Sequence, residues 1–135
     1  MIQYIASDVD GTLLHGQATT LNPELFDIIR QLKEREIHFI AASGRQYENL
    51  RHLFAPVKDD ISYVAENGSM CVHDDKIVSL GHIDTDLIYE IADAAKEYGH
   101  CHTLISTART GYTDSQDPDY IDHIHNDVGY NMDVV

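Results

Sequence analysis

Basic residues are scarce in this sequence, which contains nine Lys and Arg against 23 Asp and Glu and carries a formal net charge of −14. Because so acidic a chain repels nucleic-acid phosphates and anionic lipids, we expect neither nucleic acid nor a membrane surface as a partner. The charge is also uneven. Residues 82–135 hold two basic and eleven acidic residues, and residues 1–81 hold seven and twelve. This asymmetry predicts a domain boundary near residue 82.

Long hydrophobic runs and targeting signals are also lacking. No stretch approaches the roughly 18 apolar residues of a membrane-spanning helix. The N-terminal MIQYIASD has neither a basic segment nor a small-residue cleavage site. The only cysteines, Cys71 and Cys101, do not form a CxxC pair. Free thiols in a reducing compartment are the default for such a pair, so we expect a cytoplasmic protein.

The first 81 residues alternate between short apolar runs and helical patterns. Strands are predicted at 2–7, 37–42 and 61–66, helices at 22–35 and 46–54, and a hairpin over 69–80 that turns at Asp74-Asp75. The first strand is apolar without alternation, which is typical of a strand buried on both faces. Strands and helices in this order predict an α/β fold, with parallel strands joined by right-handed crossovers.

The pattern changes after residue 82. The predicted elements are a helix at 85–98 closed by Gly99, short strands near 101–107 and 111–114, and a helix opened by Asp117-Pro118 with Tyr120, Ile121 and Ile124 facing inward. A second, smaller α+β region is therefore expected here.

The stretch DVDGT directly follows the first strand. Side chains alternate along a strand, so Asp8 and Asp10 should point the same way, at the end of a parallel sheet where ligands bind. One interpretation makes Asp8 a nucleophile and Asp10 an acid–base group, with a divalent cation relieving their repulsion. A solvated turn is the alternative. An EF-hand loop is excluded, because Thr12 and Thr19 stand where it needs an acidic or Asn ligand and a Glu.

Two further polar stretches follow the next two strands. In AASGR, Ser43 fits a helix N-cap, with Gln46 completing a capping box. The same geometry would offer the Ser43 hydroxyl and the N–H groups of Gly44 and Arg45 to a phosphate, and both interpretations stay open. In AENGS, Asn67-Gly68 is a strong turn signal that needs no function.

Together, DVDGTLL, SGR and ENG at successive strand ends resemble the haloacid dehalogenase superfamily of phosphohydrolases, and more narrowly the Cof-type (class IIB) sugar-phosphate phosphatases. The resemblance implies an incomplete Rossmann-like core with a parallel sheet over residues 1–81. It implies the first part of an inserted α+β cap domain over residues 82–135. The implied activity is Mg²⁺-dependent hydrolysis of small cytosolic phosphomonoesters, such as sugar phosphates, through an aspartyl phosphate.

The resemblance also implies roles for individual residues. Asp8 would attack phosphorus, and Asp10 would protonate the leaving group and later activate water. The Asp8 carboxylate and the Asp10 backbone carbonyl would hold Mg²⁺. The implied phosphate-binding residues are Thr12, Ser43, Gly44 and Arg45, with Asn67 near the site.

Only the first part of the family's sequence pattern is present. The family's phosphate-binding Lys and GDxxND segment are not found, since Lys96 lies within a predicted helix and IDHIHND (121–127) matches GDxxND poorly. We therefore expect an N-terminal fragment that is inactive by itself. Its expected partners are a small phosphorylated metabolite and the missing C-terminal half of the core. Without that half, we expect self-association through the open edge of the strand at 2–7.

Other functions stay open as alternatives. A catalytically inactive interaction module, or a phosphotransferase or mutase, would use the same fold. The histidines and cysteine at 100–102 could indicate zinc with His123 and His125, but this i, i+2 pair does not share a helix face, so we do not expect a zinc site. The acidic run at 114–133 is interpreted as a solvated cap surface, not as a calcium site.

Overall fold

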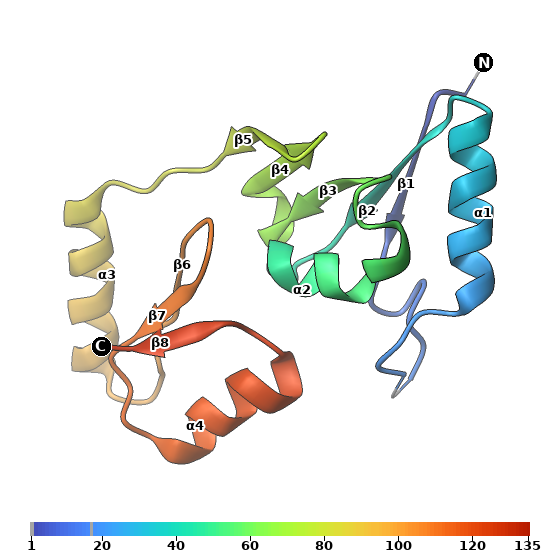
Figure 1. The fold of residues 1–135 in the computed structure, drawn as a ribbon. Coiled ribbons are helices and arrows are strands. Elements are labelled where there is room, and N and C mark those ends of the chain that lie inside the picture. The colour runs from blue at the N-terminus through green and yellow to red at the C-terminus, as the bar shows by residue number, and fades with distance from the viewer. Residues whose placement is uncertain (1, 17) are drawn as a thin grey trace. The chain divides into compact units, whose positions relative to one another are not determined.

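The computed structural model describes residues 2–16 and 18–135, and these divide after Leu80 into two compact units. Figure 1 shows the order of helices and strands in each unit. Among the described residues, no helix combines the length and the apolar character needed to cross a bilayer. Each unit is described by itself below.

The first unit is built on a five-stranded sheet whose strands lie in sequence order. Its strands are β1 (Tyr4–Asp8), β2 (His38–Ala42), β3 (Ser62–Ala65), β4 (Met70–His73) and β5 (Lys76–Leu80). The pairs β1–β2 and β2–β3 are parallel, and β3–β4 and β4–β5 are antiparallel. The connections contain the helices α1 (Pro23–Glu34) and α2 (Tyr47–Leu53) and the short 3₁₀ turns η1 (Ala55–Val57) and η2 (Glu66–Gly68). The predicted α/β class is confirmed.

Local sequence signals account for the start of α1 and for the turn between β4 and β5. Asn22 caps α1 by accepting the Glu24 N–H at 3.0 Å, and Pro23 is the first helical residue. The β4–β5 hairpin turns at Asp74 and Asp75, whose φ values of 49° and 56° match the left-handed backbone that a tight hairpin turn requires. Both predictions are therefore confirmed.

One face of the sheet carries the core of the first unit. Phe39 lies against Phe54, which follows α2, with ring centroids 6.2 Å apart, and Tyr63 meets Tyr47 of α2 edge-on at 5.2 Å. A right-handed β1–α1–β2 crossover running in the same direction places α1 on this face as well. Buried side chains on this face include Phe39, Ala41, Tyr63, Ala65, Met70 and Val72. We call it the helix face.

The opposite face of the sheet is more open, and β1 is its most exposed strand. We define the open face by Tyr4, Ala6, His38, Ile40 and Val64, whose side chains share this side in the strand register. Ala6 and His38 are exposed, and Tyr4 keeps 61% of its surface. Within the described chain, β1 pairs with β2 alone.

The prediction that residues 2–7 are buried on both faces is therefore wrong. The strand lies at a sheet edge, and α1 and α2 both cover the other face. Its apolar sequence describes the environment of a central strand, not the one it has in this chain.

The second unit contains a three-stranded sheet and two helical segments. They are α3 (Thr85–Tyr98), β6 (Ile105–Ser106), β7 (Gly111–Thr113), α4 (Pro118–Asp122), the π-helical segment η3 (His123–Val128) and β8 (Met132–Val134). Strand β7 is central, antiparallel to β6 and parallel to β8. Gly99 ends α3 with a φ of 71°, as predicted. The sequence did not predict β8, which pairs with β7 across an intervening helix.

Candidate active site

A tight loop follows β1 and carries the two aspartates. The carbonyl of Val9, which is fully buried, accepts the N–H groups of Leu13 and Leu14 at 2.8 Å each. Gly11 permits this turn, because its φ of 81° lies in the left-handed region that favours glycine. With Val9 turned into the core, the flanking Asp8 and Asp10 side chains are left at the surface.

The Asp8 carboxylate is lightly held. The Thr12 hydroxyl donates a long hydrogen bond of 3.5 Å to Asp8 Oδ2. A carboxylate with few donors around it keeps lone pairs for a metal ion or for attack on an electrophile. The Thr12 contact joins two residues of this loop four positions apart.

The Asp10 carboxylate is held firmly, by the loop that follows β2. Arg45 Nε donates to Asp10 Oδ2 at 2.9 Å and Arg45 Nη2 donates to Asp10 Oδ1 at 2.7 Å. This is the bidentate geometry in which a guanidinium binds a carboxylate most strongly. The hydrogen bonds from Arg45 hold the pKa of Asp10 below its ordinary value, although partial burial acts in the opposite direction. The Ser43 hydroxyl approaches the same Oδ2 at 3.5 Å.

The SGR loop does not form the capping box that the sequence allowed. Helix α2 begins at Tyr47 with Gln46 as its N-cap residue, and no side chain caps it. The Ser43 hydroxyl instead accepts the Arg45 N–H, two residues on, at 3.2 Å. Short hydroxyl side chains compete for nearby N–H groups in this way and shift where a helix starts. The Arg45 N–H is thereby directed at Ser43, and the Arg45 side chain at Asp10.

The ENG segment after β3 packs directly on the SGR loop. The Asn67 N–H donates to the Ser43 carbonyl at 3.2 Å, and the Glu66 N–H donates to the Arg45 carbonyl at 3.0 Å. A Cβ atom at Gly44 would lie 2.9 Å from Asn67 Oδ1, so glycine allows the two loops to meet without moving the Asn67 side chain. Asn67 therefore lies beside the SGR loop.

The donors present suit one part of a magnesium site. Within residues 2–16 and 18–135, no three or more His, Cys, Asp or Glu side chains form a group that could hold a metal ion. Mg²⁺ prefers hard oxygen ligands and usually keeps several waters, so the Asp8 carboxylate and the Asp10 main-chain carbonyl fit as a minority of its six ligands. The Asp10 carboxylate faces Arg45 instead.

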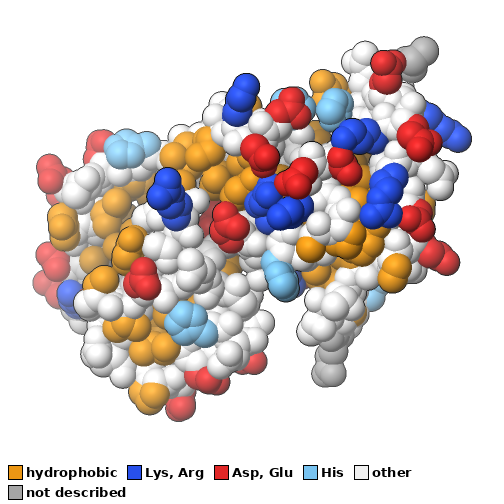
Figure 2. All heavy atoms as spheres, viewed as in Figure 1, with side chains coloured by type: hydrophobic (Ala, Val, Ile, Leu, Met, Phe, Trp, Pro, Cys, Tyr) orange, Lys and Arg blue, Asp and Glu red, His pale blue; other side chains and the backbone are white. Residues whose placement is uncertain are grey.

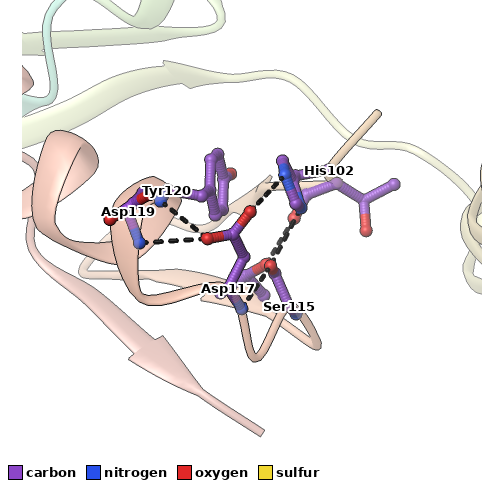
Figure 3. Close-up of polar contacts among 7 residues, drawn as sticks. His102, Ser115, Asp117, Asp119 and Tyr120 are labelled. Atoms are coloured by element: carbon purple, nitrogen blue, oxygen red, sulfur yellow. Dashed lines mark hydrogen bonds and ion pairs between the residues drawn. The ribbon is translucent and has the colours of Figure 1, made fainter. Parts of the chain in front are cut away.

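In the second unit, His102 belongs to a polar cluster with Ser115 and Asp117 at the start of α4 (Figure 3). Its Nδ1 lies 2.9 Å from the Ser115 hydroxyl and its Nε2 lies 3.4 Å from Asp117 Oδ2. The ring of His102 also stacks on Tyr120, with centroids 4.3 Å apart. Asp117 caps α4 by accepting the Asp119 N–H at 3.0 Å, which confirms the predicted helix start.

These contacts account for His102 as an anchor of the helix start. Asp117 and Ser115 are both occupied in forming the turn, since the Asp117 N–H also donates to the Ser115 hydroxyl at 3.2 Å. His123 has a different partner: its Nδ1 lies 2.8 Å from Asp127 Oδ2.

Comparison with known proteins identifies the family. Residues 5–134 match the haloacid dehalogenase-like hydrolases. This chain belongs to that family. It is 35% identical over 92 residues to the 5-amino-6-(5-phospho-D-ribitylamino)uracil phosphatase YbjI of Escherichia coli strain K12, an alignment that covers 68% of this chain and 34% of that protein. The resemblance read from DVDGTLL, SGR and ENG is confirmed.

Solved structures share the fold across nearly the whole chain. A structure from Eubacterium rectale superposes with a TM-score of 0.89 at 25% identity, over 99% of this chain and 51% of that one. The subclass IIB sugar phosphatase BT4131 has a TM-score of 0.74 at 16% identity, over 98% of this chain and 52% of its own, and shows likeness of fold alone. The haloacid dehalogenase-like chain described here thus spans about half the length of these structures.

One residue of the site was missed by the sequence reasoning. Asn49, in α2, accepts a hydrogen bond from Arg45 Nη1 at 2.9 Å. Its spacing of four residues from Arg45 is the signal that could have indicated it, because side chains four apart meet along a helix. The signal was weak because Arg45 precedes the helix.

Proposed function

We propose that the whole protein is a cytoplasmic Mg²⁺-dependent phosphatase. The chain described above spans about half the length of the solved structures that it matches. The whole protein would hydrolyse phosphomonoesters of small polyhydroxylated metabolites, such as sugar phosphates. The observation that carries this proposal is the presence of two unlike carboxylates at the end of β1. Asp8 accepts one long hydrogen bond from Thr12, and Asp10 is bound by Arg45 from the loop after β2. Family membership supports the same reaction class.

In the proposed reaction the two aspartates have different tasks. An Asp8 carboxylate oxygen attacks phosphorus, forms the aspartyl phosphate and displaces the alkoxide of the substrate. Asp10, in its protonated form, gives its proton to that leaving oxygen, although Arg45 lowers the pKa of Asp10 and so favours the carboxylate. The carboxylate that remains is the form that Arg45 stabilises, and it then takes a proton from the water that hydrolyses the intermediate. Phosphate leaves, and Asp8 is restored.

Other residues of the chain would bind the phosphoryl group. We propose that the hydroxyls of Thr12 and Ser43 and the N–H of Gly44 donate hydrogen bonds to its oxygens, with Arg45 acting through its hold on Asp10. Phosphoryl transfer depends chiefly on positioning and on neutralising charge. A Mg²⁺ ion held by Asp8 and the Asp10 carbonyl would supply part of that neutralisation.

The second unit is proposed to be the first part of a cap domain that selects the substrate. The division of the chain after residue 80 and the likeness of fold to a subclass IIB sugar phosphatase support this. The name of the Escherichia coli relative, a phosphatase of a phosphoribitylamino-uracil, supports a phosphorylated polyol or sugar as the substrate class.

The test is the loss of the nucleophile in the whole protein. Asp8→Asn should reduce the hydrolysis of p-nitrophenyl phosphate by several orders of magnitude, because removal of a nucleophile commonly costs that much. Asp86→Asn, an exposed aspartate in α3, is the matched control and should keep normal turnover. Asp8→Asn with near-normal turnover would overturn the proposal, as would phosphorylation at a residue other than Asp8 in rapidly quenched reactions.

A further inference from the structure

We infer that Asn49 is a positioning residue for the acid–base group of this site: it holds the Arg45 guanidinium in the orientation that grips Asp10. The inference deepens the proposed function and rests on it, since it assigns Asn49 a part in the reaction proposed for Asp8 and Asp10. It rests on the hydrogen bonds that join three segments of the chain, the loop after β1, the SGR loop and α2.

The first step is the geometry of the guanidinium. Arg45 uses Nε and Nη2, the two donors along one edge, to bind both oxygens of Asp10 at 2.9 and 2.7 Å. The third nitrogen, Nη1, points to the far side and donates to Asn49 Oδ1 at 2.9 Å. The planar group is therefore held from two sides, so rotation out of the carboxylate plane would break hydrogen bonds on both sides.

The second step is the rigidity of what holds it. Asn49 lies in α2 next to Leu50, which is fully buried and anchors the helix to the core. The backbone of Arg45 is fixed at both ends as well, its N–H on the Ser43 hydroxyl at 3.2 Å and its carbonyl on the Glu66 N–H at 3.0 Å. Arg45 is thus held at its backbone by these hydrogen bonds and at its guanidinium by the Asn49 side-chain amide, and from this position it binds Asp10.

The third step is what this does for the reaction. Asp10 lies in a surface loop and its side chain is 53% exposed, so packing alone does not fix its rotamer. A catalytic acid–base group must be held close to its productive geometry by neighbours whose own rotamers are fixed. Without Asn49, the guanidinium keeps its charge but gains rotational freedom, and Asp10 gains it too. The loss should appear in turnover, and not in substrate binding.

Kinetics of the whole protein provide one readout. Asn49→Ala should lower kcat about tenfold, as removal of an outer-shell orienting partner commonly does, and leave KM within about twofold. Asn49→Asp keeps an acceptor oxygen for Arg45 Nη1 and should retain most of the activity. The matched control is Glu48→Ala, which introduces the same residue at the adjacent, exposed position of α2 and should leave kcat unchanged.

Side-chain NMR of the same protein provides a readout that needs no activity. The Arg45 Nε–H should be protected from exchange in the wild type and in Glu48→Ala, and should lose protection in Asn49→Ala. Thermal unfolding should show that Asn49→Ala and Glu48→Ala are both folded, because alanine is a good helix former at both sites.

The outcomes separate this inference from the proposed function. If Asn49→Ala leaves both the Arg45 Nε–H protection and kcat unchanged, or if Glu48→Ala loses as much activity, the inference is wrong. If kcat falls only in step with a rise in KM, Asn49 acts in binding and the inference is also wrong. If the wild type hydrolyses no phosphomonoester while Asn49→Ala still releases Arg45, the proposed function fails and the hold of Asn49 on Arg45 stands.

Discussion

The contact between Gly44 and Asn67 allows a sharp test of how the site is assembled. Gly44→Ala would place a Cβ atom 2.9 Å from Asn67 Oδ1 and 3.2 Å from Asn67 Nδ2. The Asn67 backbone cannot easily retreat, because it is left-handed (φ 54°) and its N–H is bonded to the Ser43 carbonyl. The added methyl group must therefore displace the Asn67 side-chain amide or push the SGR and ENG loops apart.

The size of the effect follows from overpacking. Forcing an extra methyl group into a packed contact costs typically about 1–3 kcal/mol, and we expect Gly44→Ala to lower the free energy of unfolding by that amount. Urea unfolding followed by circular dichroism measures it, provided that the slope m stays constant. The displacement should also lower phosphatase activity in the whole protein.

A second substitution identifies the cause. Asn67→Gly removes the clashing side chain and tolerates the left-handed backbone. In the Asn67→Gly background, Gly44→Ala should therefore cost almost nothing, so that the two changes show a coupling of about 1–2 kcal/mol in a double-mutant cycle. Equal costs for Gly44→Ala in both backgrounds would refute the reasoning, since the clash would then lie elsewhere.

Three other predictions concern Asp10, the open edge of β1 and the chain's own activity. The lowered pKa of Asp10 stabilises the fold at pH values above its ordinary pKa, and this stabilisation is lost as the pH falls through the lowered value. Arg45→Met should therefore weaken the dependence on acidic pH of the free energy of unfolding in urea. The same dependence in Arg45→Met and in the wild type would contradict the pairing. The isolated chain should self-associate through β1, giving light-scattering masses above 15.2 kDa that Ala6→Lys reduces; a monomeric wild type would argue against the open edge. The isolated chain should bind Mg²⁺ weakly in calorimetry and hydrolyse p-nitrophenyl phosphate slowly, because the Asp8 carboxylate and the Asp10 carbonyl supply only a minority of the six ligands of Mg²⁺. Micromolar affinity or rapid hydrolysis would show that other residues complete the site.

Exposed apolar surface bears on the association prediction. Large hydrophobic side chains reach the surface of the molecule, as the face drawn in Figure 2 shows. On and beside β1 they include Ile2 (69% exposed) and Tyr4 (61% exposed). Apolar side chains next to unpaired strand N–H and C=O groups favour pairing with another strand.

Short-range interactions made much of this protein predictable from its sequence. The Asn22 and Asp117 caps, the Gly99 helix end and the Asp74-Asp75 turn each depend on residues within a few positions of one another. The order of strands and helices then determined the α/β class, because right-handed crossovers leave few topologies. The positions of Asp8 and Asp10 at a strand end followed from the same pattern.

Tertiary structure alone decided the contacts that couple these segments. Arg45 and Asp10 are 35 residues apart in sequence and Gly44 and Asn67 are 23 apart, so only the parallel pairing of β1, β2 and β3 brings them together. The same pairing turned the Arg45 side chain to Asp10 and left β1 paired only with β2 among the described strands. Local propensity cannot encode which strand lies beside which, because that choice depends on the burial of the whole sheet.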